Sequence, residues 1–241
     1  MVSKPKYTIM GTSRKRVPVG TRTTDMNLFT DADRKRIAEA VTQAESRTSG
    51  EIVPVIVQRS GAYRVVPYRA GVMGAVVGAL LHEIVTLGYD GWGVPMLLSD
   101  GALFFWMLAF GLLAGLLVPR IPVLFRTVAG GELMDLAVHA RASQAFLTEE
   151  VFATRDRTGI LLFLSLDEHR VEVLGDNAIN AAVKPEDWGD VISDIVQGVR
   201  SGDAVGGLER AISRCGDLLE RKGVAIKHDD TDELSNDLRI Q

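Results

Sequence analysis

The sequence is poor in the residues from which many sites are built, beginning with cysteine. Cys215 is the only cysteine among 241 residues, which excludes an intramolecular disulfide and a cysteine-based zinc site. Its spacing with Ile212 and Leu219 predicts a core position on a helix. The sequence also lacks a nucleophile elbow, a P-loop and an HExxH motif. No catalytic constellation is visible, which favours a protein that is not an enzyme.

Histidine is also sparse, and no long apolar run occurs near the N-terminus. The first 30 residues contain no hydrophobic stretch of the kind that a secretory signal needs. We therefore expect the first hydrophobic segment to be an internal membrane anchor. The four histidines are scattered and are interpreted as surface or interface residues: His82, His139, His169 and His228.

The formal net charge of −4 is unevenly distributed. The first 22 residues contain no acid and six cations, namely Lys4, Lys6, Arg14, Lys15, Arg16 and Arg22. Because they include one aromatic residue and no nucleic-acid motif, we predict that residues 1–27 form a disordered basic arm. This arm is expected to face anionic lipid headgroups rather than nucleic acid. The acidic residues 223–241 are predicted to be a flexible tail.

Two long apolar runs interrupt an otherwise average composition. Residues 70–87 and 102–118 each approach the ~20 residues with which a helix crosses a bilayer. Residues 69–120 are therefore predicted to form a transmembrane hairpin. Arginines flank this hairpin, whereas the loop 88–100 contains no Lys or Arg. The positive-inside rule then places both termini and the folded domain in the cytoplasm and the loop outside a bacterial inner membrane.

Two GxxxG motifs predict how the hairpin packs. Gly74 and Gly78 lie in the first run and Gly111 and Gly115 in the second, so that the two helix backbones can approach each other closely. Two ionisable residues, His82 and Glu83, lie in the last turn or two of the first run. Their position favours side chains that reach the far interface over an ion or proton path.

The rest of the chain shows the patterns of one soluble domain. Thr30 and Asp33 predict a capping box at the start of a helix, and residues 51–58 predict a buried strand. Pro54 in that strand argues for an edge or a bulge. Residues 160–166 and 170–174 predict a hairpin of two strands, of which the first is central and the second has one wet face.

Three further helices follow from hydrophobic periodicity, and the stripe of the last one consists of Val205, Leu208, Ile212, Cys215 and Leu219. Residues 132–152 are expected to turn six side chains inward: Leu133, Leu136, Ala137, Ala140, Phe146 and Leu147. A strong amphipathic stripe is formed by Trp188, Val191, Ile192, Ile195, Val196 and Val199. Because the single strand 51–58 has no partner of its own, we predict that it joins the later strands. Residues 28–58 and 128–222 are thus one split domain of the α+β class.

A resemblance to the TPM-domain family rests on two motifs and on Gly202-Asp203 before the last helix. The first is Ala44-Glu45-x-x-Thr48-x-Gly50-Glu51-Ile52; the second runs from Thr158-Gly159 through Glu168-His169-Arg170 to Val173. The chain most resembles the bacterial branch with a two-helix transmembrane insert. The resemblance implies an αβα sandwich with a small mixed sheet. It also implies a role as an acid phosphatase or as an assembly or auxiliary factor for a membrane complex.

The sequence departs from the family after the second motif, where Gly175-Asp176-Asn177 replaces a glycine-rich loop. The best candidates for a site are carboxylates near the end of the strand: Glu172, Asp176, Asp187 and Asp190. They would suit a divalent cation that activates water for phosphoester hydrolysis. Alternatively, Asp176 makes a turn while Asp187 and Asp190 favour a helix start.

Two functions follow. The first is an interaction or assembly module, anchored in a lipid bilayer, that needs no cofactor and binds another membrane protein or a second copy of itself. The alternative is a metal-dependent hydrolase similar to an acid phosphatase, which uses the acidic loop near Asp176.

Overall fold

The computed structural model describes residues 15–16, 29–89, 91, 96–224, 226 and 233–241. It divides into a sheet unit (Met1–Gly61 with Asp135–Gln241) and a hairpin unit (Ala62–Met134). The elements of the sheet unit are β1 (Lys15–Arg16), α1 (Asp31–Glu45), β2 (Glu51–Val57), α5 (Gly131–Thr148), β3 (Gly159–Ser165), β4 (Arg170–Gly175), α6 (Asn177–Ala182), η5 (Pro185–Trp188), α7 (Gly189–Ser201), α8 (Ala204–Arg221) and β5 (Arg239–Ile240). The first four residues of α5 are counted with the hairpin unit.

The sheet joins two distant parts of the chain. Its strand order is β1-β4-β3-β2-β5. Strand β2 pairs in parallel with β3, in a register that joins Glu51 to Gly159, whereas β4 runs antiparallel to β3. The prediction that residues 51–58 join the later strands is confirmed. Strand β3 is the middle strand and every residue in it is buried, as its apolar sequence predicts.

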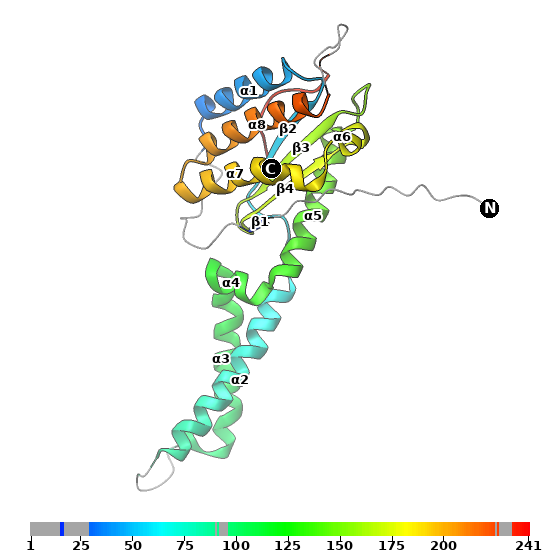
Figure 1. The fold of residues 1–241 in the computed structure, drawn as a ribbon. Coiled ribbons are helices and arrows are strands. Elements are labelled where there is room, and N and C mark those ends of the chain that lie inside the picture. Colours follow the sequence, from blue (N-terminus) through cyan, green and yellow to red (C-terminus); the bar gives the residue numbers. More distant parts are fainter. Residues whose placement is uncertain (1–14, 17–28, 90, 92–95, 225, 227–232) are drawn as a thin grey trace, which may run out of the picture. The chain divides into compact units, whose positions relative to one another are not determined.

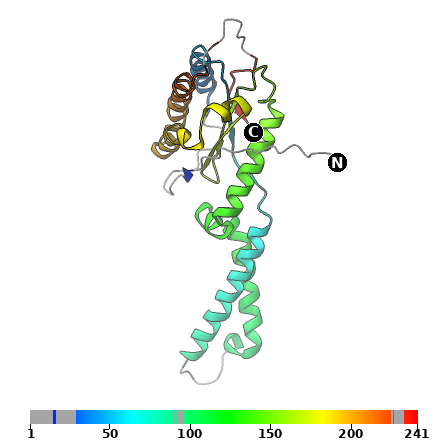
Figure 2. The same ribbon diagram turned by 45° about the vertical axis from the view of Figure 1, so that its right-hand side comes forward.

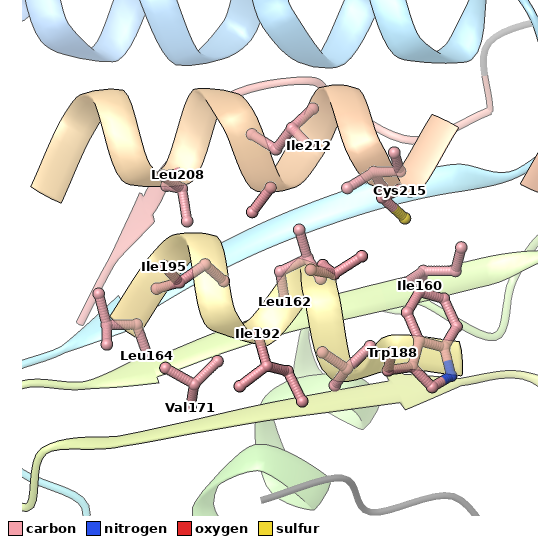
Figure 3. Packing of buried hydrophobic residues seen from close by; sticks show 14 of the residues in the cluster. Ile160, Leu162, Leu164, Val171, Trp188, Ile192, Ile195, Leu208, Ile212 and Cys215 are labelled. Atoms are coloured by element: carbon pink, nitrogen blue, oxygen red, sulfur yellow. The ribbon is translucent and has the colours of Figure 1, made fainter. Parts of the chain in front are cut away.

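Helices cover both faces of this sheet (Figures 1 and 2). The larger core lies on the face that α1, α7 and α8 cover, where the predicted stripe on α7 packs against alternate residues of the strands (Figure 3). On the other face Val138, Ala142 and Ala145 of α5 meet the opposite residues of β2 and β3. The α+β class and the αβα sandwich are confirmed. The predicted capping box of α1 is present as well, with Thr30 Oγ1 accepting from the Asp33 amide.

The two ends of the chain correct the sequence analysis. We predicted a disordered arm, yet Lys15–Arg16 pair with the outer edge of β4. The rest of the arm lies outside the described residues. We predicted a flexible tail, yet β5 pairs in parallel with β2 and Leu238 is buried in the larger core. Both strands cover backbone donors and acceptors that an open sheet edge would leave unpaired.

Two details within the domain also differ. We expected Leu136 and Leu147 of α5 to point inward, but these side chains are 60% and 64% exposed. The buried stripe is instead Met134, Val138, Ala142 and Ala145. Pro54 lies in an unbroken ladder with β3, so no bulge is present. Its predicted edge position fits the other side of β2, where pairing with β5 begins only at Val55.

The hairpin unit consists of two long helices and short helical segments. Its elements are α2 (Val65–Leu87), η2 (Met96–Leu98), η3 (Asp100–Ala102), α3 (Leu103–Leu117), η4 (Val118–Arg120) and α4 (Pro122–Ala129). Val65–Leu87 and Asp100–Arg120 are long and apolar enough to cross a membrane. Helix α2 begins five residues before the predicted span. The large apolar side chains on the outside of these helices include Val72, Val76, Leu80, Phe104, Leu108 and Leu112.

Glycine sets the distance between α2 and α3. A Cβ atom at Gly74 would lie 2.5 Å from the carbonyl oxygen of Phe110, and one at Gly78 would lie 2.6 Å from that of Trp106. On α3, a Cβ at Gly111 or Gly115 would come within 3.1–3.2 Å of an α2 carbonyl oxygen. Each of the four GxxxG glycines therefore faces the backbone of the partner helix, as small residues do where helices cross closely.

Candidate functional site

Polar side chains join β4 to α5 on the face of the sheet opposite the larger core. Arg170 of β4 forms an ion pair with Asp135 of α5, with 2.7 Å between Nε and Oδ1. Two residues along the strand, Glu172 Oε1 lies 2.5 Å from Nδ1 of His139. Because strand residues i and i+2 share a face and helix residues i and i+4 share a side, the two pairs lie in register.

Glu172 corrects the prediction of a wet strand face. Its side chain is 1% exposed, because α5 covers this side of β4. One carboxylate oxygen contacts His139, and the other has no hydrogen-bond partner. His139 thus contacts a buried carboxylate and is not an isolated surface residue. A buried carboxylate is costly without a partner, so this contact fixes where α5 sits on the sheet.

Asp176 follows β4 and starts α6. Its Oδ1 accepts from the Asn177 amide at 2.7 Å, so the turn expected of this aspartate is present. Its Oδ2 lies 2.8 Å from Nε of Arg157, whose guanidinium also lies 5.8 Å from the centre of the Phe152 ring. The Asp176 side chain is nearly buried and Arg157 is half exposed. These contacts fix the orientation of both side chains, and the ion pair lies at the protein surface, where solvent reaches Arg157.

A cavity of about 530 Å³ opens beside this ion pair. We call it the Asp176 pocket; it is lined by Ser143, Phe146, Leu147, Phe152, Arg157, Leu174, Gly175, Asp176, Asn177 and Asn180. Its walls come from α5, the loop before β3, the end of β4 and α6. Aromatic and aliphatic carbons form most of the surface, with amides and the ion pair at one side. Such a lining suits an apolar group that also carries hydrogen-bonding atoms.

The four candidate carboxylates have separate surroundings. Asp187 lies 2.5 Å from Nζ of Lys222 and accepts from the Lys184 amide, while Asp190 lies in the first turn of α7. The hydrogen bond from Lys222, then that from Lys184, lowers the pKa of Asp187. In the described part of the chain, no three His, Cys, Asp or Glu side chains are grouped to hold a metal ion. These residues therefore do not fit the divalent cation that the sequence suggested.

A second polar cluster was missed by the sequence analysis. Glu168, which is fully buried, accepts from Ser165 Oγ at 2.5 Å and from the Ser60 amide at 3.0 Å. The hydroxyls of Ser60 and Ser165 lie 2.7 Å apart. These residues close the carboxyl ends of β2 and β3. His169, also buried, takes a positive φ of 53° in the turn that follows. The sequence feature that could have revealed this cluster is the short turn after β3, which is too short to expose all of its polar side chains, including Glu168.

The polar residues of the hairpin unit point in different directions. His82 is 2% exposed, its ring lies edge-on to Trp106, and neither nitrogen has a hydrogen-bond partner. Glu83 is largely exposed, with 3.6 Å between its Oε1 and Nδ1 of His82. The expectation that His82 reaches outward is wrong, because the close crossing of α2 and α3 encloses the ring. His228 lies outside the described residues.

A comparison with protein families decides what the sheet unit is. Residues 125–218 match the model of the TPM domain. This stretch is similar to the TPM domain, and the sheet unit is called the TPM domain below. No curated protein matches the chain as a whole. Among solved structures, the chain is similar to the NMR structure of the BA42 protein from the psychrophilic bacterium Bizionia argentinensis, with a TM-score of 0.54 and 18% identity. The similarity covers 91% of this chain and 100% of BA42, and it shows a shared fold.

The match begins at α4 and ends in α8, so it includes the Asp176 pocket and the α5–β4 ion pairs. Helix α1 and strand β2 precede it. They share the sheet and the core of the matched stretch, because β2 is the parallel partner of β3 and α1 packs its buried face on the same core as α8.

Proposed function

We propose that this protein is a membrane-anchored TPM domain that binds another membrane protein through the Asp176 pocket. The observation that carries the proposal is the contrast in exposure between the two units. The hairpin helices turn large apolar side chains outward along their length, whereas the TPM domain encloses a complete core. A hairpin of this kind fits a bilayer, which would cover those side chains at no cost.

The binding role rests on α5. Leu147 lines the Asp176 pocket and is 64% exposed, and Leu136 is exposed on the same helix. Large apolar side chains beside an apolar cavity are typical of a surface that buries a partner's side chain. The partner's group would enter between Phe146 and Phe152 and meet the amide groups of α6.

The binding proposal is tested by photo-crosslinking in intact membranes. A photoreactive residue at Leu147 is expected to give one discrete adduct, and the same residue at Gln197, exposed on α7, is expected to give none. Phe152→Ser should remove the adduct while leaving the protein in the membrane. Equal adducts from both positions, or an adduct that survives Phe152→Ser, would contradict a site at this pocket.

We further propose that both ends of the hairpin and the TPM domain lie in the cytoplasm, with the loop 88–100 outside. The arginines at the start of α2 and the end of η4, and their absence from the loop, support this orientation. A thiol at Met96, which is 88% exposed, should react in intact cells with a membrane-impermeant maleimide. Cys215 gives no background, because burial removes it from solvent and raises its pKa. Reaction at Leu147→Cys, and none at position 96, would show that the protein has the opposite orientation.

A hydrolase remains the second candidate, and one observation favours it. Arg157 and Asp176 present a cation and a carboxylate beside a cavity, an arrangement that would orient a phosphate ester. Purified protein would then hydrolyse a generic phosphomonoester, and Asp176→Asn would abolish this activity. Asp190→Asn is the matched control at an aspartate outside the pocket lining. No hydrolysis with or without added divalent ions would exclude this function.

A further inference from the structure

One end of the hairpin unit carries a dense positive charge. Arg64 precedes α2, Arg69 lies in its first turns, and Arg120 and Arg126 follow α3. The first three are exposed and Arg126 is half-buried. The only carboxylates between Ala62 and Gly131 are Glu83, Asp90 and Asp100, which lie late in α2 or between the two spans. The next carboxylate is Glu132 in the first turn of α5, so that four arginines and one acidic residue lie at this end of the unit.

Two of these arginines make hydrogen bonds that leave their charge in place. Arg69 Nη1 donates to the carbonyl oxygen of Ala129 at 3.2 Å, and Arg120 Nη1 donates to that of Leu116. A carbonyl oxygen accepts one N–H without neutralising the guanidinium, which retains further donors in a planar fork. Such a fork matches the oxygens of a phosphate group.

Helix α4 lies at the same end of the unit and has two apolar sides. Phe125 and Ala129 are buried, and the Phe125 ring meets that of Tyr63 edge-on, with centroids 5.0 Å apart. This contact holds α4 against the start of α2. On its outer side Ile121, Val123 and Leu124 are 41–51% exposed. These three apolar side chains are left partly exposed to water, and an apolar surrounding that covered them would stabilise the helix.

The neighbouring side chains show what would cover them. Tyr68 on α2 is 76% exposed and sits between the arginines in the sequence. Cations, a phenol and aliphatic side chains at the end of an apolar helix pair match the boundary between lipid headgroups and acyl chains. Free phosphate would satisfy the guanidiniums and leave Ile121, Val123 and Leu124 in water. A phospholipid satisfies both.

We propose that Arg64, Arg69, Arg120 and Arg126, together with the outer side of α4, form a binding site for an anionic phospholipid. This site rests on the membrane anchoring proposed above. The phosphate binds the arginines, and the upper part of the acyl chains covers Ile121, Val123 and Leu124. Helix α4 then lies in the interface as a short amphipathic helix, and the TPM domain begins directly after it.

The depth of α4 is tested with the full chain in nanodiscs that contain equal parts of phosphatidylcholine and phosphatidylglycerol. Three single variants, Val76→Cys, Leu124→Cys and Leu147→Cys, carry a fluorophore. Two sets of lipids act as quenchers, one with a spin label near the headgroup and one with a spin label near the end of the acyl chain, so that both depths of the bilayer are sampled. These positions are 52%, 43% and 64% exposed, respectively. Quenching at positions 76 and 124 but not at 147 supports the site. Quenching at 76 alone overturns it and leaves the anchor intact. No quenching at 76 overturns the anchor itself.

Lipid selectivity is tested by mass spectrometry of the lipids that remain bound when the protein is extracted from those nanodiscs. Each interfacial arginine is expected to favour phosphatidylglycerol by about fivefold. Arg64→Gln with Arg120→Gln should reduce this excess about 25-fold, which is about fivefold for each arginine removed. Arg34→Gln with Lys35→Gln, two exposed cations of α1, should leave the excess unchanged. A bulk ratio in the wild-type protein, or an excess that the first pair of substitutions leaves unchanged, overturns the proposal.

Discussion

The TPM domain and the helical hairpin are both rich in apolar residues but solve opposite packing problems. In the domain, Trp188 and other large side chains fill the space between sheet and helices and leave little for solvent. In the hairpin, the seam contains glycines, and the large side chains face outward. Leucine and phenylalanine therefore stabilise the domain through the burial of their side chains. Glycine stabilises the hairpin because it allows the two helix backbones to pack closely.

The largest effect is expected from deleting a large side chain inside the domain. Trp188 is 2% exposed, so Trp188→Ala should lower the free energy of unfolding by about 3–5 kcal/mol. Leu80→Ala removes an outward side chain of α2 that is 58% exposed and should have little effect in detergent. Urea titrations followed by circular dichroism measure both. Equal losses in the two variants would erase the contrast between the units.

One histidine in each unit sharpens the comparison further: His139 contacts a buried carboxylate, and His82 is itself buried. His139→Ala should cost about 2 kcal/mol, because it leaves Glu172 buried without its partner. Adding Glu172→Gln should recover part of this loss, as a double-mutant cycle would show. His82→Leu in the hairpin should cost nothing, since neither ring nitrogen makes a hydrogen bond. A destabilising His82→Leu would indicate a polar partner for that ring.

Enlarging a glycine at the helix crossing should destabilise the hairpin, whereas truncating an outward side chain should not. A methyl group at Gly74 would clash with Ala114 and Phe110, which outweighs the helix propensity of alanine and gives a net loss of about 1 kcal/mol. Gly71→Ala on the same helix meets only ordinary contact at 3.5 Å and should stabilise α2. Thermal melts in detergent compare the pair. A stabilising Gly74→Ala would mean that α2 and α3 do not cross as closely as described.

The smallest effect concerns the surface of the domain. Contact with Lys222 and Lys184 lowers the pKa of Asp187 in the folded state below its ordinary value. The stability from this contact is therefore complete above the ordinary aspartate pKa of about 4 and is lost as pH falls through the lower, folded value. Lys222→Met should lower the melting temperature slightly at neutral pH, where the contact is complete, and should therefore weaken the fall over that acidic range. Lys35→Met on α1 serves as the control.

Much of the TPM domain could be predicted because its helices each bury one stripe. The periodicity of Ile37, Val41 and Ala44 and that of the α7 residues correspond to buried positions. Helix α5 defeated the same reasoning, because apolar residues lie on two of its sides and only tertiary contacts select Met134 and Val138 over Leu136 and Leu147. Periodicity reports how many sides are apolar, and it does not say which of them is covered.

The candidate site was harder to predict for an electrostatic reason. Alternation along β4 correctly placed Glu172 on the side opposite Val171 and Val173. It could not show that α5 would cover that side or that His139, 33 residues earlier, would meet the carboxylate. Local propensity also gave no sign of β5, whose two residues gain order only from the edge of β2. Charge pairs and edge strands depend on partners that are distant in the chain.

The contact between Tyr63 and Phe125 has a consequence for how fast the sheet can form. Strand β2 must find β3 across a long intervening chain, since their register joins Glu51 to Gly159. Once α2 and α3 have paired, the two rings lie 5.0 Å apart and more than half of that chain no longer counts as loop. Each halving of loop length lowers the entropic cost of closure by about 0.6 kcal/mol. The paired hairpin thus shortens the effective loop between β2 and β3. Weakening the contact between Tyr63 and Phe125 should therefore slow the folding of the sheet unit, although both rings lie in the hairpin unit.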